Sequence, residues 1–314
     1  MSDRPTVLVQ TGSMYRIETI PTRDVPIAVQ IWHDPALDPT LCAREGRAVL
    51  LAHPTGFHGV AWRPVAEYLV AHGFAVWSFD FRAHGDSAWH GDPAGITWQG
   101  FADDAVAVVD WLALPPGELL GVGISKGGAS LIRVENRRPG TFRALWLWEP
   151  IIMPPPPDDF DREAHATQGN PMSEAARRRR STFDNRAQAL DNYAGKPPLG
   201  ALDRRALAAY VEYGFADRDD GTVELKCQPE HESAVYRPYP DSDAWHALAD
   251  LTVPTMILGG ALSNTINPEQ AALLAQRSPM AQGVGYDGVG HFGPFEDPDR
   301  FGAAIADWAK SVGP

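Results

Sequence analysis

A serine between closely spaced glycines is the strongest chemical signal in this chain. The stretch G-I-S-K-G at residues 123–127 follows the apolar run 118–120 and precedes a segment, 129–135, that can be helical. A G-x-S-x-G pattern between a strand and a helix is typical of a sharp turn that exposes the serine hydroxyl, and its glycines leave room for strained backbone. Backbone N–H groups at the start of the helix would favour negative charge there. We therefore predict that Ser125 is a nucleophile rather than an ordinary turn serine.

A histidine near the end of the chain has the right setting to activate that hydroxyl. A serine hydroxyl is a weak nucleophile until an imidazole takes its proton. Of the ten histidines, His291 lies in the glycine-rich stretch 288–295, between the last expected strand and the last expected helix. A loop at the carboxyl edge of the sheet can reach the serine turn. We predict that His291 is the general base.

Negative charge that develops on an attacked carbonyl oxygen needs two backbone N–H donors. One is expected from Lys126, the residue directly after the nucleophile. The other is expected from the loop 53–59, which follows a short apolar strand. Pro54 has no N–H to donate, so Thr55 is the first choice in this loop and Phe57 the second.

Several side chains of metal-binding type lie in and after that loop. They are His53 and His58, followed later by Asp80, His84 and Asp86. No pair among them has the spacing of a helical zinc motif. We expect them to stabilise turns, and we predict a site that uses neither a metal nor a cofactor.

Strand-like and helix-like segments alternate through much of the chain, which predicts an α/β fold with a doubly wound, mostly parallel sheet. Ligands of such sheets bind outside the carboxyl ends of the strands, where the serine turn also lies. The expected strands are 15–20, 27–32, 48–52, 74–79, the strand leading into the serine turn, 144–148, 254–259 and 282–286. The expected helices are 60–71, 101–112, 129–135, 268–276 and 299–310.

The alternation stops at about residue 151, where a proline run at 154–157 cannot continue a helix or a central strand. We predict that residues 151–250 form a helical cap inserted into a core domain made of 1–150 and 251–314. Within the cap we expect a helix over 173–193, a helix that carries Leu207, Tyr210 and Val211 on one face, and a short strand at 223–225.

Four consecutive arginines, Arg177 to Arg180, stand in the first of these cap helices. Such a run can recruit an anionic partner or substrate. Glu174 is close enough to pair with Arg177 or Arg178 at helical spacing. We interpret the run as a solvated helix face.

Composition limits the class of protein. With 314 residues, 44% hydrophobic and 21% charged, the chain can bury a large core. No apolar run approaches membrane-spanning length, and residues Met1 to Pro5 do not begin a secretory signal. The two cysteines, Cys42 and Cys227, suit a reducing cytoplasm, where we expect the protein to act. A formal charge of −13 disfavours a nucleic-acid partner.

Four motifs together resemble those of the α/β-hydrolase superfamily, in order and in spacing. They are the loop His53-Pro54-Thr55-Gly56-Phe57, the segment Asp80 to Ser87, the turn at Ser125, and Gly290-His291-Phe292-Gly293-Pro294-Phe295. The resemblance extends from about Tyr15 to the C-terminus and is weakest between 151 and 250. It implies an esterase-like or lipase-like serine hydrolase fold with a cap inserted after the sixth strand. Dehalogenases and epoxide hydrolases of this superfamily use aspartate where this chain has Ser125, which counts against both.

Members of this superfamily use a third catalytic residue, an acid that orients the histidine and completes a triad. In this chain that residue departs from the family pattern. The family usually places an aspartate shortly after the seventh strand, and the corresponding residue here is Asn264. Glu149, at the carboxyl end of the strand 144–148, is our candidate, and some dehalogenase-like members resemble this arrangement. Asp287 and Glu296 are the alternatives, although Asp287 is very near His291 in sequence and Glu296 suits the first turn of a helix.

The combined expectation is a serine hydrolase that cleaves a small-molecule carboxylic ester, a lactone or a thioester through an acyl-enzyme. Ser125, His291 and Glu149 would form the triad, and the Thr55 and Lys126 N–H groups would hold the oxyanion. A hydrolase of C–C bonds in ring-cleavage products is an alternative, as is a binding protein that has lost turnover. The oligomeric state and the natural substrate do not follow from the sequence.

Overall fold

The computed structural model describes residues 15–161, 163–164, 170–238 and 243–313. The segment Met1 to Pro5, used above to argue against a secretory signal, lies outside the described residues. No helix in the described part of the chain is long and apolar enough to cross a membrane. Both cysteines are buried and neither forms a disulfide.

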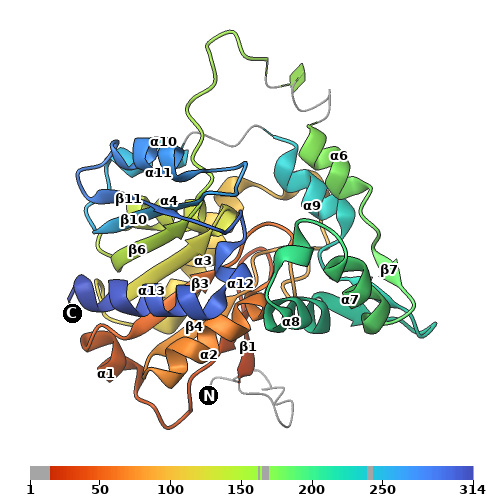
Figure 1. Cartoon of the computed structure of the whole chain (residues 1–314), viewed down its shortest axis with the longest axis horizontal. Coiled ribbons are helices and arrows are strands. Elements are labelled where there is room, and N and C mark those ends of the chain that lie inside the picture. The colour runs from red at the N-terminus through yellow and green to blue at the C-terminus, as the bar shows by residue number, and fades with distance from the viewer. Residues whose placement is uncertain (1–14, 162, 165–169, 239–242, 314) are drawn as a thin grey trace.

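A sheet of eight strands forms the centre of the molecule, in the order β1-β2-β4-β3-β5-β6-β10-β11 (Figure 1). The pairs β1–β2 and β2–β4 are antiparallel, and every pairing from β4–β3 to β10–β11 is parallel. The predicted mostly parallel sheet is therefore confirmed. Its strands are β1 (Arg16–Ile20), β2 (Ile27–Ile31), β3 (Ala48–Ala52), β4 (Ala75–Phe79), β5 (Leu119–Ile124), β6 (Phe142–Trp148), β10 (Thr255–Gly260) and β11 (Ala281–Tyr286).

Helices pack on both faces of this sheet (Figure 1). On one face α3 and α10 pack against α4, and on the other α13 packs against α2. Each face buries its own apolar cluster, because successive side chains of a strand point to opposite sides. The helices of these layers are α1 (Pro39–Arg44), the 3₁₀ turn η1 (Gly59–Trp62), α2 (Arg63–Ala71), η2 (Pro93–Gly95), α3 (Trp98–Leu112), α4 (Lys126–Arg137), α10 (Asp243–Ala249), α11 (Pro268–Ala275), α12 (Gly293–Glu296) and α13 (Pro298–Ser311).

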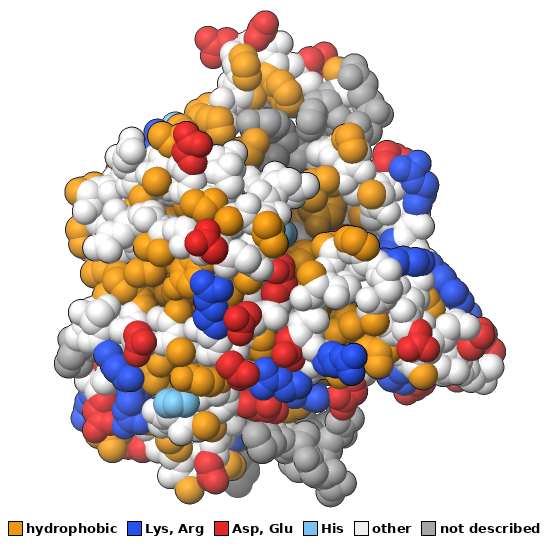
Figure 2. Space-filling model, in the orientation of Figure 1, with side chains coloured by type: hydrophobic (Ala, Val, Ile, Leu, Met, Phe, Trp, Pro, Cys, Tyr) orange, Lys and Arg blue, Asp and Glu red, His pale blue; other side chains and the backbone are white. Residues whose placement is uncertain are grey.

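Strand β11 closes one edge of the sheet and is only partly buried along its length. In Figure 2, apolar side chains gather on the surface above α13, in the region of β10 and β11. An edge strand has a partner on one side only, which explains why β11 is less buried than the central β5.

The chain between β6 and β10 forms a separate group of elements, which lies at the right of Figure 1. A small antiparallel sheet in the order β7-β9-β8 joins its helices. The last helix before β10, α10, lies outside this group because it packs on α4. The group consists of α6 (Pro171–Arg177), β7 (Thr182–Phe183), α7 (Arg186–Ala194), η3 (Leu199–Ala201), α8 (Arg204–Gly214), β8 (Phe215–Asp217), β9 (Val223–Leu225) and α9 (Pro229–Tyr236).

The single helix predicted over 173–193 is wrong. The chain leaves the helix after Arg177, and Thr182 and Phe183 pair with β9 instead. A new helix then begins because the Asn185 side chain accepts a hydrogen bond from the Gln188 N–H (3.0 Å). The helical segment is interrupted because residues 182–183 pair with a strand far along the chain. The local sequence pattern holds no information about that pairing.

Candidate active site

Ser125 occupies a strained turn between β5 and α4. Its φ of 54° and ψ of −118° place a residue with a side chain in a region that favours glycine. The flanking glycines are required by close approach. A Cβ at Gly127 would lie 2.3 Å from the Ala52 carbonyl oxygen, and a Cβ at Gly123 would lie 2.6 Å from the Gly128 nitrogen. The G-x-S-x-G spacing therefore allows β3 and α4 to approach the turn at Ser125.

Trp148, the last residue of β6, connects the serine turn to the loop that carries His291. Its carbonyl oxygen accepts a hydrogen bond from the Ser125 N–H (2.9 Å). Its indole Nε1 donates to the His291 carbonyl oxygen (2.9 Å). A Cβ at Gly293 would lie 2.5 Å from the indole ring, so the loop can approach Trp148 only with glycine there. Ser125 and His291 are thus both hydrogen-bonded to one fully buried residue.

His291 faces Glu149, the residue that follows β6. The distance from His291 Nδ1 to Glu149 Oε2 is 2.7 Å. The Glu149 side chain is fully buried, whereas 21% of the His291 side chain is exposed. Glu149 itself has a φ of 44°, so its backbone is also in the left-handed region. An Nδ1–H donated to this carboxylate leaves Nε2 as the nitrogen that can accept a proton.

Three further donors hold the Glu149 carboxylate. The Gly260 N–H donates to Oε1 (3.1 Å), and the Ser263 hydroxyl (2.6 Å) and the Ile266 N–H (3.2 Å) donate to Oε2. These groups belong to the end of β10 and the loop after it, the region in which the family usually carries its acid. These donors fix the orientation of the carboxylate beside the imidazole.

The other residues considered for the acid lie elsewhere. Asn264 and Asp287 are exposed on the surface. Glu296 accepts hydrogen bonds from the Gly290 N–H (2.8 Å) and the Phe292 N–H (3.2 Å), so it stabilises the backbone of the histidine loop. Of the candidate carboxylates, the structure places Glu149 against the imidazole.

The loop after β3 forms a hydrogen-bonded turn at residues 54–57. The Phe57 N–H donates to the Pro54 carbonyl oxygen (3.3 Å), and Gly56 has a φ of 77°, as the third position of a type II turn requires. Phe57, the second choice for the oxyanion, is therefore already engaged. Within the described part of the chain no acceptor is seen for the Thr55 N–H. The Lys126 N–H belongs to the first turn of α4, where no preceding helical carbonyl can accept it.

The side chain of Lys126 is completely buried. Its ammonium lies 4.3 Å from the centre of the Phe81 ring and 4.3 Å from that of Phe101. His84 Nε2 is 3.5 Å from Lys126 Nζ. Burial lowers the pKa of Lys126 to about 7, because little water solvates the charged form.

The histidines of the loops are engaged by backbone groups. His53 Nδ1 lies 2.7 Å from the Pro54 carbonyl oxygen, and its Nε2 accepts from the Phe81 N–H (3.0 Å). His84 Nδ1 lies 2.8 Å from the Arg82 carbonyl oxygen. Burial lowers the pKa of both imidazoles well below the usual value. These contacts fit the turn-stabilising role expected of them.

Asp80 is a buried carboxylate that joins three segments. It accepts hydrogen bonds from the Gly59 N–H (2.7 Å), the Asp86 N–H (2.8 Å) and the Tyr213 hydroxyl (2.8 Å). Burial raises its pKa to about 6. Among the described residues no three His, Cys, Asp or Glu side chains gather in a way that could hold a metal ion.

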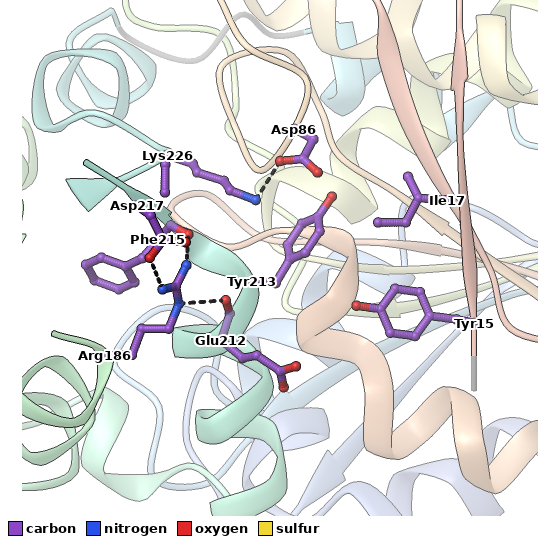
Figure 3. A pocket seen from close by; sticks show the side chains of 10 residues that line it. Tyr15, Ile17, Asp86, Arg186, Glu212, Tyr213, Phe215, Asp217 and Lys226 are labelled. Atoms are coloured by element: carbon purple, nitrogen blue, oxygen red, sulfur yellow. Dashed lines mark hydrogen bonds and ion pairs between the residues drawn. The ribbon is translucent and has the colours of Figure 1, made fainter. Parts of the chain in front are cut away.

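A cavity of about 300 Å³ lies beside β1, and none of the candidate triad residues lines it. Figure 3 shows Tyr213 between the charged side chains that line the cavity. Each charge in its lining has a partner of opposite sign, so an ionic ligand would have to break an existing pair. The pairs are Lys226 with Asp86 (2.5 Å), Arg186 with Asp217, and Glu212 with Arg63 (2.8 Å). We assign this cavity no part in the chemistry at Ser125.

Sequence reasoning missed two residues that organise the site. Ser263 donates a hydrogen bond to Glu149. Its position next to Asn264 is the only sequence feature that could have pointed to it. Trp148 is visible in the sequence only as the last apolar residue of the strand 144–148, although this place at the carboxyl end of a buried strand is a signal that it lies at the site.

The sequence pattern of the alpha/beta hydrolase family matches residues 49–304. No functionally curated protein matches the chain by sequence. Similar solved structures include the thioesterase domain from the curacin biosynthetic pathway, E-2-(acetamidomethylene)succinate hydrolase and an esterase of Mycobacterium tuberculosis. They are 21%, 20% and 19% identical to this chain, with TM-scores of 0.70, 0.70 and 0.69. The alignments cover 96%, 93% and 95% of this chain and 99%, 98% and 93% of theirs. The likeness confirms the predicted α/β-hydrolase fold.

Proposed function

This chain belongs to the alpha/beta hydrolase family, and on that premise we propose that it is a serine hydrolase that cleaves a small-molecule carboxylic ester, a lactone or a thioester. Ser125, His291 and Glu149 are the proposed triad. The Thr55 and Lys126 N–H groups are the proposed oxyanion donors. The reaction uses no metal and no cofactor in this proposal.

The first half-reaction transfers the acyl group to the enzyme. The Ser125 hydroxyl attacks the carbonyl carbon while His291 Nε2 takes its proton. The carbonyl oxygen gains negative charge and accepts hydrogen bonds from the two backbone donors. The imidazolium then gives the proton to the leaving oxygen or sulfur, and the bond from that atom to the carbonyl carbon breaks.

The second half-reaction returns the enzyme to its starting state. Water loses a proton to His291 Nε2 and attacks the acyl-enzyme. The imidazolium returns a proton to Ser125 as the acid product leaves. Glu149 stays ionised throughout and stabilises each imidazolium.

The observation that carries the proposal is the contact between His291 and Glu149. The Nδ1–Oε2 distance is 2.7 Å, and three other donors hold the same buried carboxylate. An arrangement of this kind fixes the imidazole tautomer in which Nε2 can act as a base. It also accounts for the departure at Asn264, because Glu149, directly after β6, supplies the carboxylate instead.

Two broader parts of the prediction, the division into a core and a cap and the location of the protein, remain proposals. Residues 1–150 and 251–314 form the hydrolase core, and 151–250 a cap, with α10 packed on the core side. Apolar side chains of β7, α7, α8, β8 and β9 form one cluster with a face of the sheet, as a cap seated on a core requires. Two unpaired cysteines support a reducing cytoplasm as the location.

Hydrolysis of a p-nitrophenyl ester series with short to medium acyl chains tests the proposal. Ser125→Ala removes the nucleophile and is expected to abolish turnover. Ser130→Ala is the matched control, because Ser130 is a buried serine on α4 whose hydroxyl donates to the Lys126 carbonyl oxygen (2.9 Å). Loss of activity in the first variant but not in the second would support the serine hydrolase.

The alternatives predict different results. Folded wild-type protein that cleaves no ester but is labelled at Ser125 by a fluorophosphonate would direct the search to C–C substrates, with a dienone acid as the first one tested. Protein that neither turns over esters nor reacts with the probe would contradict the proposal and favour a ligand-binding protein.

A further inference from the structure

The arginine run is not uniformly a solvated face. Arg177, Arg178 and Arg180 are exposed, and Arg177 pairs with Glu174 (2.9 Å) as expected. Arg179 is different, since only 18% of its side chain is exposed. The helix ends just before it, which turns its guanidinium inward. The solvated-face interpretation is therefore wrong for this one residue.

Arg179 lies at the centre of a polar cluster built from three helices. Its Nη1 donates to Glu232 Oε2 of α9 (2.7 Å). Its Nη2 donates to the Tyr210 hydroxyl of α8, and to the Tyr193 hydroxyl of α7 at 3.4 Å. The guanidinium carbon lies 5.3 Å from the centre of the Tyr193 ring and 5.9 Å from that of Tyr210.

This cluster rests on the turn at residues 54–57. The Tyr210 hydroxyl donates to the Gly56 carbonyl oxygen (3.1 Å). The Glu232 carboxylate packs against the same residue, because a Cβ at Gly56 would lie 2.6 Å from Oε1. The Tyr210 carbonyl oxygen also lies 3.0 Å from His58 Nε2, just beyond the turn. The cluster thus contacts the turn through the Tyr210 and Glu232 side chains, and the Tyr210 backbone contacts His58 next to the turn.

We propose that Arg179 is a positioning residue: it holds the Tyr210 hydroxyl on the Gly56 carbonyl and thereby fixes the turn that presents the Thr55 N–H to the oxyanion. The inference rests on the proposed function. A hydrogen bond to the Gly56 carbonyl fixes the orientation of its planar peptide group. That peptide group joins Gly56 to Phe57, whose N–H closes the turn on the Pro54 carbonyl oxygen (3.3 Å). If this peptide group is free to rotate, the turn opens and the Thr55 N–H within it moves away from the reacting oxygen.

Arg179 acts through other residues rather than on the substrate. Its charge is already paired with Glu232, and that carboxylate would repel an anionic substrate. Misplacement of a catalytic group by about 1 Å can lower a rate about 100-fold. Loss of one oxyanion donor costs about 100- to 1,000-fold in kcat. A loosened turn is therefore expected to lower kcat roughly ten- to 100-fold.

The experiment compares Arg179→Met with Tyr210→Phe and with their double variant. Both single changes are expected to lower kcat for a p-nitrophenyl ester by about ten- to 100-fold, with KM changed less than about threefold. The double variant is expected to lose no more than the worse single, because both changes break one chain of contacts. Arg178→Met, an exposed neighbour, is the matched control and is expected to have wild-type kinetics.

A second readout follows the oxyanion directly. A trifluoromethyl ketone forms an oxyanion on Ser125, so its affinity is expected to fall with kcat in Arg179→Met and Tyr210→Phe. Arg179→Lys keeps the charge but has no planar fork, and it is expected to recover only part of the activity. Tyr210→Phe removes one hydroxyl and keeps the ring, so it tests the proposal even where Arg179→Met folds poorly.

Three results would overturn the inference. They are a kcat within twofold of wild type in Tyr210→Phe, additive losses in the double variant, and a rise in KM alone, which would mean that Arg179 contacts the substrate. Ser125→Ala separates this failure from failure of the proposed function. If Ser125→Ala is inactive while Tyr210→Phe is normal, only the positioning role is wrong.

Discussion

Replacing Glu149 by glutamine is the sharpest test of its proposed role as the acid of the triad. The amide is almost the same size as the carboxylate, so packing around this fully buried side chain is preserved. The substituted side chain can place its amide oxygen where Oε2 lies and still accept from His291, Ser263 and Ile266. Its amide nitrogen then replaces Oε1 and faces the Gly260 N–H, so that one hydrogen bond is lost. The amide also cannot supply the negative charge beside the imidazolium.

The size of the effect follows from the separation of the charges. Two unit charges about 4 Å apart attract by about 4 kcal/mol at an effective dielectric constant of about 20. A loss of about 4 kcal/mol in the transition state corresponds to roughly a 1,000-fold slower reaction. If the amide nitrogen instead faces His291 and forces the wrong tautomer, the loss approaches the roughly 10⁴-fold seen for the equivalent change in serine proteases. We expect kcat/KM of Glu149→Gln to fall by about 10³- to 10⁴-fold.

The assay is kcat/KM for the p-nitrophenyl ester that the wild-type enzyme cleaves fastest. Asn264→Ala is the matched control at the position where the family usually carries its acid, and it is expected to stay within about twofold of wild type. Ser263→Ala removes one hydrogen bond to the charged carboxylate and is expected to lose about tenfold. Thermal unfolding establishes that each variant is folded at the assay temperature.

Two outcomes would refute this reasoning. One is a loss below about tenfold in folded Glu149→Gln, which would mean that the imidazolium does not depend on this carboxylate. The other is equal loss in Glu149→Gln and Asn264→Ala.

Three further predictions concern stability. Asp104→Asn weakens the buried pair with Arg82 (2.7 Å) and is expected to lower the free energy of unfolding in urea by about 3–5 kcal/mol. Lys126→Met removes a buried amine whose pKa is lowered to about 7. Between about pH 7 and pH 10 the unfolded wild type binds more protons than the native state. The free energy of unfolding of the wild type is therefore expected to rise with pH relative to that of Lys126→Met. Urea unfolding at several pH values measures this difference. Gly127→Ala places a Cβ 2.3 Å from the Ala52 carbonyl oxygen, and it is expected to lower both the melting temperature and kcat.

Each of these predictions has a matched control. Asp103→Asn changes an exposed neighbour and is expected to alter stability by less than about 1 kcal/mol. Lys310→Met changes an exposed lysine and is expected to alter the free energy of unfolding by less than about 0.5 kcal/mol. Gly195→Ala meets only an ordinary contact of 3.6 Å, so it is expected to be tolerated. A variant that behaves like its control contradicts the corresponding prediction.

Much of the sheet could be predicted because its signals are local. Strand β3 reads as a short apolar run, and in the structure all five of its residues are buried. The turn at Ser125 needs small residues at fixed distances, and those residues are visible as glycines. The helix predicted over 173–193 failed for the opposite reason, since pairing of Thr182 and Phe183 with β9 depends on residues about forty positions later.

The candidate site also has some features that local sequence determines and others that only the tertiary structure determines. The sequence by itself located the turn at Ser125, the loop that carries His291 and a short list of carboxylates, because each depends on neighbours within a few residues. Only the tertiary structure decided that Glu149 faces His291, since β6 and β10 had to pair before the loop after β10 could surround that carboxylate. Burial likewise distinguished Arg179 from the arginines beside it. Which side chains meet depends on strand order and helix packing, and these bring together residues that no local pattern connects.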